Sequence, residues 1–110
     1  MRFLMLVCSD PEAEPYRAEE DDIEGWFESV SSSGSHLDGD RLQPAQETRT
    51  VGVRNGDVRV TEGPADQAST AVVGFDLLQC ADWDDALGIA ARHPMARFGR
   101  IELRALWPLE

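Results

Sequence analysis

Asn55 and Gly56 constrain the fold of this 110-residue chain more than any other short segment. Both central residues of a type I′ turn need positive φ, which asparagine and glycine tolerate, so the dipeptide predicts a two-residue hairpin. A turn here pairs the flanking residues in a definite register, which is Arg54 with Asp57, Val53 with Val58, and Val51 with Val60. The four valines are therefore expected on one face of the hairpin.

Apolar periodicity predicts the other strands. Residues 3–8 are apolar at every position, which is typical of a strand that is covered on both faces. Residues 72–78 and 100–107 read as two further strands. Residues 35–46 and 61–70 are polar and contain glycine and proline, so both segments are expected to be connecting loops.

Two helices are predicted from apolar stripes at helical spacing. The first stripe consists of Ile23, Trp26, Phe27 and Val30, and the second of Trp83, Leu87, Ala90 and Ala91. Asp82 is suited to cap the second helix, and the His93-Pro94 dipeptide to end it. The order of elements is then β-α-β-β-β-α-β. This order predicts an α+β fold, a ferredoxin-like antiparallel sheet with two helices on one face and an extra β-hairpin.

The first strand also bears on assembly. Two helices can cover only one face of the sheet, whereas residues 3–8 are apolar on both faces. A second copy of the chain is the simplest cover for the other face. We therefore expect a homodimer whose sheets face each other.

Composition narrows the class of function. The formal charge is −11, and such an acidic surface repels nucleic-acid phosphates and anionic membranes. No segment has the length and flanks of a membrane span or a secretion signal, so we expect a cytoplasmic protein.

The cysteines are expected to be free thiols. If the strands at residues 3–8 and 72–78 are antiparallel neighbours, Cys8 and Cys80 lie at opposite ends of the pair, about 15–20 Å apart at ~3.3 Å per residue. The chain has no Cys/His cluster at metal spacing, no P-loop and no GxGxxG motif. We expect neither a metal site nor a cofactor.

An ordered set of segments resembles the YCII-related proteins of the DGPF type. The matching segments are Phe3–Val7, Gly39–Pro44, Asn55–Asp57, Val60–Pro64, Gly74–Phe75, Ala86–Pro94 and Arg97–Arg104. The resemblance covers nearly the whole chain and implies one domain, residues 1–110, that dimerises into an α+β barrel. It also implies an association with extracytoplasmic-function sigma factors. The chain departs from the DGPF motif itself, because Glu62 stands for the aspartate and Ala65 for the phenylalanine.

Several polar residues are candidates for a site. His93 follows the second helix, where a basic side chain suits the helix dipole, or it acts as a general acid or base at a cleft rim. Glu62, Gly63 and Pro64 form either a simple turn or a rigidly held ligand contact. His36 could pair with Asp38 or Asp40, or it is a solvent-exposed loop residue without a role in a site. Arg41 and Arg97 either bind an anionic ligand or pair with surface acids.

Two hypotheses of function follow. The first is a non-catalytic small-ligand-binding or regulatory module, acting as a homodimer and linked to a sigma factor, because no catalytic motif is present. The second is a small cofactor-independent enzyme of the dimeric-barrel type, with Glu62 or His93 as acid/base and Arg97 as anion clamp. A pocket in which His93, Glu62 and an arginine converge would favour the enzyme. We expect any ligand between the 35–46 and 61–70 segments, which are long for so small a domain.

Overall fold

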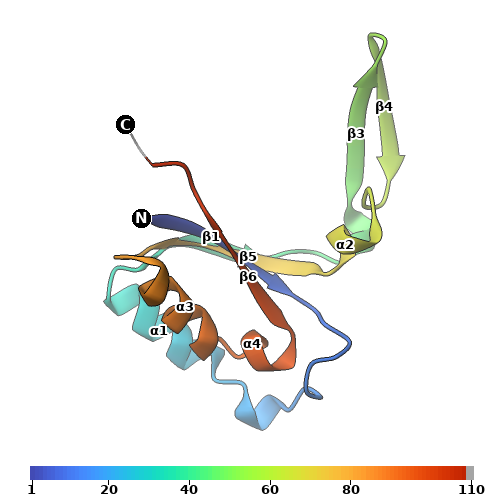
Figure 1. Cartoon of the computed structure of the whole chain (residues 1–110). Coiled ribbons are helices and arrows are strands. Elements are labelled where there is room, and N and C mark those ends of the chain that lie inside the picture. The colour runs from blue at the N-terminus through green and yellow to red at the C-terminus, as the bar shows by residue number, and fades with distance from the viewer. Residues whose placement is uncertain (109–110) are drawn as a thin grey trace.

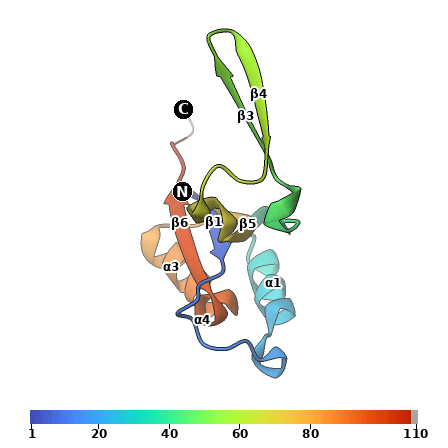
Figure 2. The ribbon, with the colours of Figure 1, turned by 90° about the vertical axis from the view of Figure 1, so that its right-hand side faces the viewer.

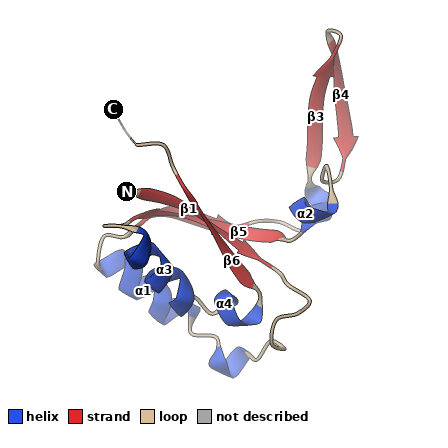
Figure 3. Cartoon of the chain, in the orientation of Figure 1, coloured by secondary structure: helices blue, strands red, loops and turns tan. Residues whose placement is uncertain are grey.

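The computed structural model describes residues 1–108, which form an α+β fold (Figures 1 and 3). Its strands are β1 Arg2–Cys8, β2 His36–Arg41, β3 Arg49–Arg54, β4 Asp57–Glu62, β5 Val72–Gln79 and β6 Arg100–Ala105. Its helices are α1 Ile23–Ser32, α2 Gln67–Thr70, α3 Trp83–Arg92 and α4 Met95–Phe98, with short 3-10 turns at Ala18–Glu20 and Ala45–Glu47. None of these helices is long and apolar enough to cross a membrane.

Four strands form the main sheet in the order β2-β5-β1-β6, with every pair antiparallel. Helices α1 and α3 lie together on one face of this sheet (Figure 1). This is the predicted ferredoxin-like plan, so the predicted fold class is confirmed.

The core lies between the sheet and the two helices. Alternate residues of β1, namely Phe3, Met5 and Val7, are buried on the helix side. The side chains between them, Leu4 and Leu6, point to the opposite face, which no helix covers, and are only half-buried. Within residues 1–108, the doubly apolar first strand is therefore covered by helices on one face only.

The helices meet through a buried indole. Trp26 of α1 donates its Nε1–H to the carbonyl oxygen of Ile89 in α3 at 2.9 Å. The N-cap of α3 is Asp82, as predicted, and its side chain accepts the N–H of Asp85. The predicted stripe of α3 is confirmed at Ala90 and wrong at Trp83, Leu87 and Ala91, which are exposed. The buried residues are Ala86, Ile89 and Ala90. The small Ala86 side chain lets this face of the helix approach the sheet closely.

The 35–46 segment is not only a loop, because it contains β2, an edge strand of the main sheet. Two features hid this strand. Its composition is polar because four of its six residues are exposed, and its alternation is broken by a register shift between His36 and Asp38. The 61–70 segment likewise contains the end of β4 and the short helix α2.

The hairpin has the predicted register, with Val53 opposite Val58 and Val51 opposite Val60. Asn55 and Gly56 have φ of 53° and 83°, as a type I′ turn requires. However, β3 and β4 form a separate two-stranded sheet that projects from the body (Figures 1 and 2).

Both cysteines are free thiols, as predicted. Cys8 lies opposite Val72 at one end of the β1–β5 pair, whereas the N–H of Cys80 bonds to the carbonyl of Met1 at the other end.

Candidate functional site

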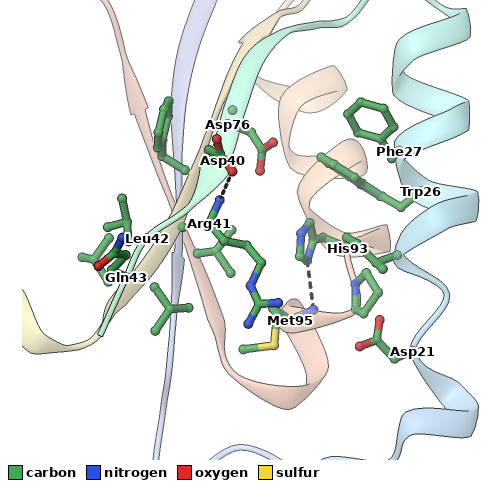
Figure 4. A pocket seen from close by; sticks show the side chains of 18 of the residues that line it. Asp21, Trp26, Phe27, Asp40, Arg41, Leu42, Gln43, Asp76, His93 and Met95 are labelled. Atoms are coloured by element: carbon green, nitrogen blue, oxygen red, sulfur yellow. Dashed lines mark hydrogen bonds between the residues drawn. The ribbon is translucent and has the colours of Figure 1, made fainter. Parts of the chain in front are cut away.

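A cavity of about 770 Å³ opens between α1 and the β2 edge of the sheet (Figure 4). One wall is aromatic and consists of Trp26 and Phe27 of α1. The polar groups that line it include, from five separate segments, Tyr16, Asp21, His36, Arg41, Asp76 and His93. The sheet, α1 with the segment before it, and the residue that follows α3 thus each contribute side chains to one cavity.

A histidine–carboxylate pair spans the two strands at this edge. His36 Nε2 lies 2.7 Å from Oδ1 of Asp76, and the two side chains are only 10% and 14% exposed. Asp76 stands opposite Met5 in the β1–β5 ladder, so its carboxylate points toward the helices from within an apolar strand. Burial raises the pKa of Asp76, while the hydrogen bond from His36 opposes that rise.

Neighbouring groups fix this pair in place. The Phe27 ring lies edge-on to the His36 imidazole, with ring centres 5.0 Å apart. On the strand side, Gly39 faces Asp76 in the β2–β5 ladder. A Cβ at Gly39 would lie 2.4 Å from Asp76 Oδ1 and 2.6 Å from the Phe75 carbonyl oxygen. Only glycine leaves room there for the carboxylate.

His93 also lines the cavity and is buried, with 6% of its surface exposed. Its Nδ1 accepts the N–H of Met95 at 3.0 Å, and its ring lies edge-on to Trp26 at 4.7 Å (Figure 4). Burial lowers its pKa to about 4, and the negative charge of Asp21 only partly opposes this. The ring is therefore neutral at pH 7 and carries its proton on Nε2. The predicted role as a cation at the helix end is wrong, because the side chain is desolvated.

Arg41 reaches from β2 into the same space (Figure 4). Within residues 1–108 its guanidinium makes no ion pair, although acids outnumber bases two to one in this chain. By contrast, Arg97 contacts Glu14 at 3.1 Å and Glu20 at 3.2 Å. Of the two predicted anion binders, Arg41 is the one available to a ligand, and Arg97 is a surface ion-pair residue outside the lining of this cavity.

Two further residues of the cavity lining, Tyr16 and Asp21, contact each other. The hydroxyl of Tyr16 donates to Asp21 Oδ2, and this bond raises the pKa of the tyrosine. Asp21 Oδ1 is buried without a hydrogen-bond partner within residues 1–108. No group of three or more His, Cys, Asp or Glu side chains in that part of the chain is arranged to hold a metal ion.

The structure brings together some of the predicted site residues but not all of them. His36, Arg41 and His93 line the cavity, whereas Glu62, Gly63 and Pro64 lie at the base of the projecting hairpin and do not line it. Within one chain, the cavity therefore takes in residues 39–45 but only Thr70 from the 61–70 segment.

The predicted partners of His36 are wrong. Asp38 and Asp40 alternate with Gly39 on the other face of β2, and each accepts the backbone N–H of the residue that follows it. Sequence reasoning missed the true partner, Asp76. One signal could have identified it, because a single acid inside an otherwise apolar strand must be paired.

Comparison with known proteins places the chain in a family. No protein with curated annotation matches it. Its structure is similar to that of 5-chloro-2-hydroxyhydroquinone dehydrochlorinase from Burkholderia phenoliruptrix, solved in complex with 2,5-dihydroxybenzoquinone. The TM-score is 0.53 at 14% sequence identity, over 97% of this chain and 94% of the other, which shows a shared fold. The model of the YCII-related domain matches residues 1–110 in full. The chain belongs to the YCII-related family.

Proposed function

We propose that this protein is a small cofactor-independent enzyme that transfers a proton on a small, planar, anionic substrate. The observation that carries the proposal is the His36–Asp76 pair, held at 2.7 Å in a cavity with an aromatic wall. A buried, partnered histidine in a cleft is the usual form of a general acid or base. The acid–base residue is therefore His36, in place of the Glu62 or His93 of the initial hypothesis.

The hydrogen bond of the pair supports a separate role for each of its two residues. With Asp76 ionised, His36 donates its Nε2–H to the carboxylate, which leaves Nδ1 as the nitrogen that takes the substrate proton. Asp76 then orients the ring and stabilises the imidazolium that forms. The edge-on Phe27 ring restricts rotation of the imidazole.

Two other groups, His93 and Arg41, stabilise the negative charge that forms on the substrate when its proton is removed. Neutral His93 presents Nε2–H as a donor, because its Nδ1 is occupied by the Met95 N–H. A neutral imidazole can stabilise a developing oxyanion without carrying a charge itself. Arg41, which makes no ion pair within residues 1–108, binds an anionic substituent of the substrate.

The aromatic side chains that line the cavity indicate the class of substrate. Flat indole and phenyl surfaces from Trp26 and Phe27 suit a planar ring or enolisable carbonyl compound. The dehydrochlorinase with the similar fold acts on a chlorinated hydroxyhydroquinone, a planar ring with hydroxyl groups. That likeness supports the enzyme hypothesis and suggests hydroxylated rings as the first compounds to test.

The test is proton exchange. Small hydroxylated aromatic acids and cyclic 1,3-diketones are incubated with the protein in D₂O, and deuterium incorporation is followed by NMR. We expect exchange of at least one compound, and a loss on the order of 100-fold or more in H36Q, within the range of one acid–base group. E62Q is the matched control, because Glu62 does not line the cavity. Equal rates in H36Q and the parent would refute the proposal.

The second candidate function is a non-catalytic binding module. It is favoured because the cavity is partly open to solvent. Binding of a ring compound without any proton exchange would support it. The protein would then act as a regulatory homodimer, associated with a sigma factor as the family resemblance implies.

We also propose a cytoplasmic homodimer built through the open face of the main sheet. The half-buried Leu4, Leu6, Phe75 and Leu77 on that face support it, because no helix of the described residues, 1–108, covers them. Light scattering after size exclusion tests the oligomeric state, and a monomer at micromolar concentration would contradict it.

A further inference from the structure

The β3–β4 hairpin is amphipathic. Its cross-strand pairs place Val51, Val53, Val58 and Val60 on one face, where each is 59–68% exposed. The pairs between them, Thr50 with Thr61, Gly52 with Arg59 and Arg54 with Asp57, make the other face polar. A hairpin with one solvated face normally buries its apolar face. Here, nothing within residues 1–108 covers the valines.

The hairpin also stands away from the body (Figures 1 and 2). The radius of gyration is 16.1 Å, against about 13 Å for a compact domain of this length. A two-stranded sheet without packing is marginally stable in water, and four exposed valines invite association. The conformation of this hairpin is therefore expected to depend on a surface that receives it.

The chain carries a matching surface. The hairpin and residues 106–108 both rise on the side of the main sheet that α1 and α3 do not cover (Figures 1 and 2). Beside the sheet face that the proposed dimer covers, the N–H of Leu106 bonds to the Arg2 carbonyl oxygen, and the next residue, Trp107, is 92% exposed. The valine face and Trp107 are thus two exposed apolar surfaces of one molecule, and a copy of the chain related by a two-fold axis would supply both surfaces again.

Charge favours the same occupant. Residues 49–62 contain three arginines and two acids, which gives this segment a net charge of +1. Since the whole chain has a formal charge of −11, the residues outside the hairpin together carry −12. An arm that lacks the acidity of the body approaches a second acidic body with little repulsion.

We propose that the β3–β4 hairpin is a dimer arm that packs its valine face on the body of a second copy of this chain. This rests on the homodimer proposed above and adds a specific contact to it. Each arm reaches the other copy, so the two contacts are equivalent and the assembly closes as a dimer.

Sedimentation equilibrium of two double variants tests the arm. V53K/V58K places two lysines at a facing pair on the valine face, and T50K/T61K does the same on the polar face with equal added charge. We expect the dimer dissociation constant to rise on the order of 100-fold or more in V53K/V58K, because two valines lose their apolar cover. In T50K/T61K it should change by less than about tenfold.

A crosslinking measurement keeps the test decisive if the lysines unfold the hairpin. A benzophenone side chain at position 58 is activated in a mixture of ¹⁵N-labelled and unlabelled protein. We expect crosslinked peptides that join labelled to unlabelled chains, with attachment at or near residues 106–108. Crosslinks confined to single chains in a dimeric protein would overturn the arm but leave the facing sheets intact. A monomeric parent protein would overturn both.

Discussion

Replacing Gly39 with alanine tests whether the His36–Asp76 pair depends on the bare backbone of β2. The new Cβ would lie 2.4 Å from Asp76 Oδ1 and 2.6 Å from the Phe75 carbonyl oxygen. The carboxylate can move aside, but the carbonyl belongs to the β5 backbone beside the β2–β5 ladder. We expect the free energy of unfolding to fall by about 1–3 kcal/mol, the usual cost of overpacking.

Gly88 supplies the matched control. It lies within α3, and a Cβ there would meet only Arg92 Nη1, at 3.7 Å. G88A should raise the free energy of unfolding by about 0.5–1 kcal/mol, because alanine is the better helix former. The same chemical change is thus expected to have opposite signs at the two positions, with a difference of about 1.5–4 kcal/mol between the variants.

Urea unfolding at pH 7, followed by tryptophan fluorescence, measures both effects, provided that the slope with denaturant stays constant. Adding D76A should reduce the cost of G39A without removing it, because the Phe75 carbonyl remains. If G39A proves as stable as G88A, the crowding inferred around Asp76 is incorrect.

Three further outcomes are expected. Burial lowers the pKa of His93 from 6.5 to about 4, so the unfolded chain binds a proton first as the pH falls, and about 3 kcal/mol of stability present above pH 6.5 is lost by pH 4. H93Q should flatten that part of the stability curve measured by urea unfolding, and an unchanged curve would contradict the assignment. Thiol titration of denatured, unreduced protein should find two free groups, Cys8 and Cys80, whereas a single one or none would not fit. R41A should weaken binding of hydroxylated aromatic acids by about 10–100-fold in fluorescence titrations, as loss of one charge-assisted contact implies. The control E62A is expected to bind these acids as the parent protein does. Equal weakening by both substitutions would indicate a site nearer the hairpin.

Much of the fold could be predicted because local chemistry and global pattern agree there. The Asn55-Gly56 turn allows only one register, and that register places all four valines together. The position of the hairpin could not be predicted, since an amphipathic hairpin has the same pattern in a large sheet as on its own. Strand β2 was missed because an edge strand with a bulge loses the alternation that identifies strands.

In the candidate site, too, some features could be predicted from the sequence and others could not. His36 could be identified as a candidate from its residue type, but its partner depends on which strand lies beside β2. The register shift between His36 and Asp38 places His36 on the helix side while Asp38 faces away. A regular strand would have set both on one face, the arrangement that sequence spacing suggested. One extra residue in an edge strand therefore decides that the histidine meets the buried Asp76, and with it whether the cavity has an acid–base pair at all.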